Sequence, residues 1–182
     1  MWLLILKSFY FTLPAYLANM SPVIFDKLGI FKFLKKPIDG GRKIRGDYIF
    51  GSGKTWRGIV SGAIFGVLAV LIQSFLHSFD IFENIAIIDY SSGIILFGLL
   101  AGLGAILGDL TKSFFKRRFK IKSGRPWPIF DQLDFIVGFI LFTYFIATPP
   151  IEIIITIFLI TLILHPLTNL VSYFLGIKKV WW

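Results

Sequence analysis

Residues 58–76 have the sequence GIVSGAIFGVLAVLIQSFL, which contains no charged side chain and decides the class of fold. A helix needs roughly 20 apolar residues to cross the hydrocarbon core of a bilayer, and we therefore predict a transmembrane helix here. The whole chain agrees, because its 182 residues are 56% hydrophobic and 16% charged, whereas soluble domains are about 25% charged. This composition excludes a disordered chain, a coiled coil, a collagen and a soluble enzyme with one core.

Four further apolar runs lie along the chain. They cover approximately residues 1–25, 91–111, 128–148 and 153–177. Each run is long enough for one crossing. The sequence therefore predicts an all-α integral membrane protein, in which residues 1–182 form one transmembrane domain, a bundle of five transmembrane helices. Glycines four residues apart, at Gly62 and Gly66 and at Gly104 and Gly108, predict helices that pack closely in lipid.

The charges between these runs alternate in sign. Residues 26–57 carry nine Lys or Arg side chains and residues 112–127 carry seven, while residues 77–90 carry none. Lys178 and Lys179 follow the last run. Basic loops remain in the cytoplasm, so we predict that both basic loops and the C-terminus are cytoplasmic and that the N-terminus is outside. The expected location is the cell membrane, crossed several times, with the active site on the cytoplasmic face.

The chain has no cysteine and only two histidines, which limits the kinds of site it can contain. Disulfides, thiolate metal sites and a cysteine nucleophile are excluded, and a His-rich metal site is disfavoured. His165 precedes Pro166 inside the last apolar run. We interpret this pair as a helix kink whose polar group is satisfied within the bundle.

The first basic loop contains a glycine-rich segment, Gly51-Ser52-Gly53-Lys54-Thr55, directly before the run at 58–76. Glycine-rich backbone followed by Lys and Thr at a helix start is suited to binding phosphate. The segment is not a Walker A loop, because Tyr48 occupies the position of the first glycine of that motif. The alternative is a basic loop that serves membrane topology alone.

The second basic loop brings acids, cations and a hydroxyl together. If the third helix continues past residue 111, then Asp109, Lys112, Ser113 and Lys116 share one face. Asp131 and Asp134 are three residues apart and also share a face if helical. Carboxylates at the membrane surface indicate a functional site, and three of them suit a hard cation such as Mg²⁺. The alternative is that the acids only form ion pairs with nearby Lys and Arg.

These segments resemble the CTP-dependent phosphatidate cytidylyltransferases and, more closely, their archaeal branch, the CDP-archaeol synthases. The resemblance covers about residues 14–138. It is carried by Pro14-Ala15-Tyr16-Leu17-Ala18-Asn19, Pro37-x-Asp39-x-Gly41, Gly53-Lys54-Thr55-Trp56-x-Gly58, Gly108-Asp109-x-x-Lys112-Ser113, and Pro128-x-x-Asp131-Gln132-x-Asp134. It implies a Mg²⁺-dependent nucleotidyltransferase of phospholipid biosynthesis. The implied substrates are CTP and an unsaturated geranylgeranylglycerol phosphate, and the products are a CDP-lipid and pyrophosphate.

The resemblance, together with the patterns above, assigns roles to particular side chains. The expected catalytic residues are Asp131, Asp134, Lys112, Lys116 and Arg117. The expected CTP-binding residues are Asp39, Gly41, Arg42, Gly53, Lys54, Thr55, Arg57, Lys112 and Ser113. The expected metal ligands are Asp109, Asp131 and Asp134. The expected partners are CTP, the lipid phosphate and the bilayer, with no nucleic acid.

Three other functions compete with this interpretation. An ester-lipid phosphatidate cytidylyltransferase would use the same chemistry. A CDP-alcohol phosphotransferase would show an Asp-Gly pair followed by further spaced acids, of which only Asp39-Gly40 is present. A small transporter would show charges near the middle of the bilayer and repeated halves, and neither is seen in the sequence. The residues that read the base, the number of metal ions and the oligomeric state are not determined by these patterns.

Overall fold

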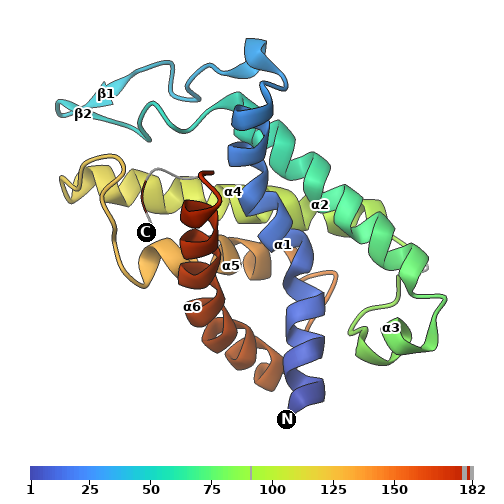
Figure 1. Cartoon of the computed structure of the whole chain (residues 1–182). Helices are drawn as coiled ribbons and strands as arrows, with labels where there is room; N and C mark the ends of the chain where they lie inside the picture. The colour runs from blue at the N-terminus through green and yellow to red at the C-terminus, as the bar shows by residue number, and fades with distance from the viewer. Residues whose placement is uncertain (91, 178–179, 181–182) are drawn as a thin grey trace.

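The computed structural model describes residues 1–90, 92–177 and 180, and it is mostly helical (Figure 1). The predicted basic tail residues Lys178 and Lys179 lie outside the described residues. The helices are α1 (Trp2–Leu28), α2 (Trp56–Leu76), α3 (Asp80–Ile85), α4 (Ile94–Arg118), α5 (Phe130–Thr143) and α6 (Ile151–Phe174), with a short 3₁₀ helix at Lys32–Leu34. Two strands, β1 (Lys43–Ile44) and β2 (Asp47–Tyr48), lie at the end of the molecule opposite the N-terminus.

The prediction of a helical membrane protein is confirmed by these helices. Among the described residues, α2, α4 and α6 are long and apolar enough to cross a membrane. Helix α5 has 14 residues, which at 1.5 Å per residue spans about 21 Å and is shorter than the ~30 Å hydrocarbon core. It ends at Thr143 rather than at residue 148. Residues before proline avoid helical angles, which fits the extended chain that leads into Pro149.

Two local elements differ from the prediction of a purely helical chain. Strands β1 and β2 pair in antiparallel fashion through Lys43–Tyr48 and Ile44–Asp47. The turn between them has φ angles of 53° at Arg45 and 86° at Gly46, and two successive positive φ angles are the pattern of a tight hairpin turn.

The second difference is in α4, which continues to Arg118 through the first part of the predicted loop at 112–127. Its last turn is basic, which suits the negative end of a helix dipole.

Glycines on three helices allow the backbones to touch. A Cβ atom on Gly66 of α2 would collide with the carbonyl oxygen of Gly98 on α4, and one on Gly138 of α5 would collide with that of Gly104. The close packing predicted from the glycine spacing is therefore confirmed. Gly108 meets the carbonyl oxygen of Asp134 in the same way, so this contact places the acidic end of α5 directly against α4.

We expect Gly108→Ala to destabilise the protein, because the new methyl group would push Asp134 away from α4. Overpacking of this kind costs about 1–3 kcal/mol. Thermal unfolding of the detergent-purified protein measures the change. Gly53→Ala is the matched control, since no atom lies within 4 Å of a Cβ placed there and its φ angle is not in the left-handed region. Equal melting temperatures for the two variants would contradict the proposed contact.

Polar groups join α1 to its neighbours inside the bundle. The Gln73 side-chain amide of α2 donates to the carbonyl oxygen of Tyr10 at 2.6 Å. The hydroxyls of Tyr16 and Thr161 are 2.7 Å apart and link α1 to α6. Aromatic rings fill the space between α1, α4 and α5, where Phe11 lies 5.2 Å from Phe139 between ring centroids. These contacts hold α1 and α6 beside the ends of α4 and α5 that carry the predicted site.

Candidate active site

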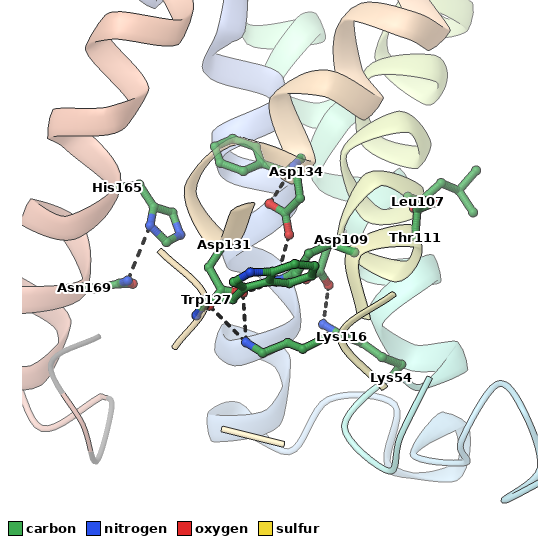
Figure 2. A network of polar contacts seen from close by, with 12 residues as sticks. Lys54, Leu107, Asp109, Thr111, Lys116, Trp127, Asp131, Asp134, His165 and Asn169 are labelled. Atoms are coloured by element: carbon green, nitrogen blue, oxygen red, sulfur yellow. Dashed lines mark hydrogen bonds and ion pairs between the residues drawn. The ribbon is translucent and has the colours of Figure 1, made fainter. Parts of the chain in front are cut away.

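Three carboxylates surround one lysine where α4 and α5 meet. The Lys112 Nζ lies 3.2 Å from Asp109 Oδ1, 2.8 Å from Asp131 Oδ1 and 2.8 Å from Asp134 Oδ2. Asp109 and Lys112 are one turn apart on α4, while the two other acids come from the first turns of α5. Figure 2 shows the three acids turned toward a common centre. The predicted metal ligands are thus brought together, and an ammonium lies between them.

A second lysine and a backbone amide hold Asp131 in this arrangement. Lys116 Nζ lies 3.1 Å and 3.0 Å from the two oxygens of Asp131, and the Trp127 N–H donates to Asp131 Oδ2 at 2.5 Å. Carboxylates are favoured near the N-terminus of a helix, which is where Asp131 lies in α5. Both oxygens of Asp131 are therefore committed to cations and to a backbone donor, which fixes its position.

The glycine-rich loop brings a third lysine to the cluster. Lys54 forms an ion pair with Asp109, although 55 residues separate them in the chain. The side chains of both residues are largely buried. Three lysines, Lys54, Lys112 and Lys116, therefore face three acids. The cluster is close to electrically balanced as it stands, so an added triphosphate or an added cation would have to compete with existing ion pairs.

Asp39 shapes the glycine-rich loop from within. Its carboxylate accepts hydrogen bonds from the N–H groups of Gly41 at 2.9 Å, Phe50 at 3.0 Å and Gly51 at 3.3 Å. The residue is 8% exposed. Burial raises the pKa of the Asp39 carboxyl, but the backbone donors of Phe50, Gly41 and Gly51 outweigh it, so the pKa lies below its usual range. Asp39 therefore positions the segment that carries Lys54.

Other predicted CTP ligands lie away from the cluster. Arg57 is buried and forms an ion pair with Asp26 of α1, and Thr55 is the residue that precedes α2. Arg42 is exposed in the loop before β1, and the Gly41 N–H is used by Asp39. The structure thus gives Arg57 a structural partner within the protein, which the basic spacing of the loop did not reveal.

Asp39→Asn should weaken binding of the expected substrate, CTP, because an amide cannot accept all three backbone hydrogen bonds of the loop. Losing hydrogen bonds to a charged acceptor costs about 1.5–3 kcal/mol each, and we expect the KM for CTP to rise about tenfold or more. Steady-state kinetics and hydrogen exchange at the Phe50 and Gly51 amides measure the effect. Asp47→Asn, in the same loop, is the control, since its carboxylate accepts no hydrogen bond from the described residues.

The same hydrogen bonds predict how the loop responds to pH. A carboxyl whose pKa is lowered in the folded protein stabilises the fold at pH values above its pKa in the unfolded chain, which is about 3.9. This stabilisation is lost as the pH falls through the lower pKa that the carboxyl has in the folded protein. The protection of the Phe50 and Gly51 amides, taken as their exchange rate relative to that of an unstructured amide at the same pH, should therefore fall only below about pH 4 in the original protein. A loss of protection that begins at higher pH would contradict this role for Asp39.

Two cavities of different character share a wall at the acidic cluster. A cavity of about 340 Å³ contains Lys54, Asp109, Lys116 and Asp131 and reaches α6. A second, of about 600 Å³, opens between α4 and α5 and is lined by Phe115, Phe119, Trp127, Phe130, Leu133 and Val137. Lys112 and Asp134 belong to both. The charged cavity and the apolar cavity therefore meet at the ion pair between Lys112 and Asp134.

A smaller cavity of about 160 Å³ extends the charged side toward the glycine-rich loop. It is lined by Gly53, Lys54, Lys112, Ser113, Lys116 and Arg117, with Phe50, Ser123 and Gly124. The predicted residues Ser113 and Arg117 thus face the same space as Lys54. Four cationic side chains and two hydroxyls around one small cavity form an environment suited to phosphate oxygens.

The sequence reasoning missed the contribution of α6. His165 and Asn169 line the charged cavity, and Asn169 Nδ2 lies 3.5 Å from His165 Nδ1. Figure 2 shows both side chains on the side of Asp131. From the sequence alone, His165 is interpreted as part of a proline kink. The available signal was their four-residue spacing, which places two polar side chains on one face of an otherwise apolar helix.

The donor set is suited to a magnesium ion, but its centre holds an ammonium. Carboxylate oxygens are the ligands that Mg²⁺ prefers, and three carboxylates converge here. Across residues 1–90, 92–177 and 180, however, no group of three acidic, His or Cys side chains has the arrangement of a metal site. The acids instead hold Lys112, so the ammonium and a cation are alternative partners of the same oxygens.

Comparisons with known proteins agree over nearly the whole chain. The sequence profile described as CarS-like CDP-archaeol synthase matches residues 1–182. The chain is 40% identical to the CDP-archaeol synthase of Methanocaldococcus jannaschii over 180 residues, which is 98% of each chain. It is 42% identical to that of Methanosarcina mazei over 183 residues, covering 93% of this chain and 99% of the relative.

A solved structure is similar as well. It is described as an intramembrane enzyme for archaeal membrane lipid biosynthesis, and it superposes with a TM-score of 0.75 at 28% identity, covering 91% of this chain and 94% of the other. The family resemblance inferred from the motifs is confirmed by these matches. The chain with the acidic cluster around Lys112 belongs to the CDP-archaeol synthase family, a family of membrane enzymes of archaeal lipid biosynthesis.

Proposed function

We propose that this chain transfers the cytidylyl group of CTP to the phosphate of an unsaturated archaeal ether lipid, releasing pyrophosphate. The observation that carries the proposal is the shared wall of the two cavities at Lys112 and Asp134. A reaction between a highly charged nucleotide and a lipid needs a polar space and an apolar space that meet where the phosphates react. The membership of the chain in the CDP-archaeol synthase family supports the choice of reaction.

The bond changes fit the residues at this wall. An oxygen of the lipid phosphate bonds to the α-phosphorus of CTP, while the bond from that phosphorus to the oxygen bridging to the β-phosphate breaks. The electron pair leaves with pyrophosphate. In transfers of this kind the protein contributes mainly positioning and charge stabilisation. Lys54, Lys116 and Arg117 would bind the triphosphate, and Ser113 would donate a hydrogen bond to it.

The apolar cavity between α4 and α5 would accept the lipid chains. Its aromatic and aliphatic lining, including the stacked pair Trp127 and Phe130 with ring centroids 4.3 Å apart, suits hydrocarbon. Lys112, at the wall, would attract the lipid phosphate toward the charged cavity. Because this cavity opens between two helices, the lipid substrate would enter it from the bilayer, and only the lipid headgroup would leave the hydrocarbon region.

Magnesium would be held by Asp109, Asp131 and Asp134. A bound Mg²⁺ would neutralise charge on the triphosphate oxygens and on the departing pyrophosphate. The three acids supply its negatively charged oxygens, and Lys112 and Lys116 balance them when no cation is bound. A protein that holds the acids in place by ammonium groups avoids the repulsion that three adjacent carboxylates would otherwise experience.

The proposed topology places this site in the cytoplasm. Five crossings would need α1 to span the membrane, and α5 to span it together with the residues that follow it up to Pro149. They would put the glycine-rich loop, the C-terminal end of α4 and the N-terminal end of α5 on the basic side of the membrane. The positive-inside rule supports this orientation, because 18 of the 19 Lys and Arg residues fall on that side. CTP is present in the cytoplasm, so the charged cavity would face its substrate.

The test is pyrophosphate release by the detergent-purified chain, given CTP and Mg²⁺ with and without the geranylgeranyl ether-lipid phosphate. ATP and an ester phosphatidate serve as comparison substrates. We expect release that requires CTP and the ether lipid together. Equal release with the ester lipid would show a broader cytidylyltransferase, and no release with any lipid from folded protein would contradict the proposed reaction.

A further inference from the structure

A separate cavity of about 380 Å³ lies beside the charged one. It is formed by the loop before α5 and by the C-terminal half of α6, and its lining includes Pro126, Pro128, Asp131, Gln132, His165 and Asn169. Its volume lies within the roughly 300–1,000 Å³ range of ligand sites. Asp131, His165 and Asn169 also line the charged cavity, so the two spaces adjoin.

The chemistry of this cavity differs from that of its neighbours. No Lys or Arg is among its described lining residues, whereas the charged cavity contains Lys54, Lys112 and Lys116. Its polar groups are two amides, an imidazole and the Asp131 carboxylate, whose oxygens already accept from Lys112, Lys116 and the Trp127 N–H, and proline rings form much of the remainder. An amide offers both donors and an acceptor. Such a wall is suited to a neutral, flat ring with hydrogen-bonding groups on its edge, and poorly suited to a phosphate.

Gln132 is one of the polar residues of this wall that the proposed reaction does not use. It lies between Asp131 and Asp134 in the first turns of α5 and is half-buried. Its backbone N–H bonds to Ile129, and its side-chain amide makes no hydrogen bond within the part of the chain that the structure describes. Both ends of that amide are therefore available to a ligand in the cavity.

The position of the cavity relative to the cations defines which part of a nucleotide it could hold. The small cavity with Ser113 and Arg117 lies on the side of the glycine-rich loop. The cavity of about 380 Å³ lies on the side of α6, where Figure 2 shows His165 and Asn169. Asp131 belongs to this cavity and accepts from Lys112 and Lys116. A nucleotide whose phosphates contact the lysines could therefore extend its base past Asp131 into this space.

We infer that the cavity between the loop before α5 and α6 is the nucleobase site, and that Gln132 contacts the edge of the cytosine. This inference rests on the proposed use of CTP. Cytosine presents an amine donor where uracil presents an oxygen acceptor. An amide that accepts from the amine and donates to the ring would favour cytosine, and it would do so without contacting any phosphate.

The test compares nucleotide binding with phosphate binding in the full-length, detergent-purified chain without lipid. Titration calorimetry with Mg²⁺ present measures the Kd of CTP, UTP and inorganic tripolyphosphate. For Gln132→Leu we expect about a tenfold weaker Kd for CTP, the loss of roughly one net hydrogen bond. We expect a smaller preference for CTP over UTP and an unchanged Kd for tripolyphosphate. The unchanged tripolyphosphate value also shows that the variant is folded.

Ser172→Ala is the matched control. It lies on α6 and lines a neighbouring cavity between α1 and α6, outside the nucleobase site, so all three Kd values should remain as in the original protein. An unchanged CTP affinity and CTP/UTP ratio in Gln132→Leu would overturn the base assignment. So would an equal loss of CTP and tripolyphosphate binding, which would make Gln132 a phosphate contact. Failure of the original protein to bind CTP would instead contradict the proposed function.

Discussion

Asp134→Asn is expected to abolish product formation while leaving a folded, detergent-soluble protein. The Asp134 side chain is 4% exposed and lies 2.8 Å from Lys112 Nζ, and its other oxygen accepts from the Phe135 N–H at 2.7 Å. The amide has nearly the same shape, and Lys112 keeps two other carboxylates. Fold and solubility should therefore survive the substitution.

The activity should not survive, because the charge of Asp134 lies where the charged and apolar cavities meet. Loss of one electrostatic contact to the reacting groups costs about 10²–10³ in kcat. Loss of a metal ligand would lower kcat further, so we expect kcat to fall by a factor of at least about 10³. Single-turnover transfer from labelled CTP, with thermal unfolding of the same sample, separates catalysis from folding.

Glu152→Gln provides the matched control for this change. It makes the same acid-to-amide replacement at the exposed first turn of α6, away from the cluster. Its turnover should equal that of the original protein. Near-normal turnover in Asp134→Asn would contradict both the metal assignment and the placement of the reaction at the shared wall.

The long helices could be predicted because each carries its own signal. A charge-free run as long as the bilayer is thick has few stable alternatives to a membrane helix. The glycine spacing also predicted close packing, since small residues four apart leave a groove for a neighbouring backbone. The hairpin around Arg45 and Gly46 and the six-residue helix α3 had no comparable periodic signal, and both were missed.

The site was predictable where one helix positions several residues. Asp109, Lys112 and Lys116 share a face because of the helical period alone. The pairing of Lys54 with Asp109 joins residues 55 positions apart, and no local pattern encodes such a contact. For the same reason, sequence alone did not separate Arg57, which pairs with Asp26, from cations that face the cavity.

The position of α6 was the largest omission. Its sequence is almost wholly apolar, and a single His beside a Pro is ordinarily a structural feature. Only the packing of α6 against α1 and α5 places His165 and Asn169 at the wall of the charged cavity. Long-range packing thus completes a site whose charged half is already visible in the sequence of α4 and α5.

Lys112→Met should remove activity and at the same time increase the response of the protein to Mg²⁺. The ammonium of Lys112 lies within 3.2 Å of all three acids, so it competes with any cation for the same oxygens. Without it, the carboxylates repel one another, and a bound Mg²⁺ relieves this repulsion. A ligand at 100 times its Kd stabilises the folded state by about 2.7 kcal/mol, which corresponds to a rise of roughly 5–11 °C in melting temperature for a chain of this size.

Thermal unfolding with and without Mg²⁺ measures this response, and single-turnover transfer measures the loss of activity, which we expect to be at least 10³-fold as for Asp134→Asn. Lys122→Met is the control, because Lys122 is exposed in the loop after α4 and forms no ion pair among the described residues. A larger Mg²⁺ shift in Lys112→Met than in Lys122→Met means that the three carboxylates bind the cation once the ammonium is gone. Equal shifts, with activity lost, would mean that the acids serve only to hold Lys112 for the phosphates, and that Mg²⁺ reaches the enzyme with CTP rather than through Asp109, Asp131 and Asp134.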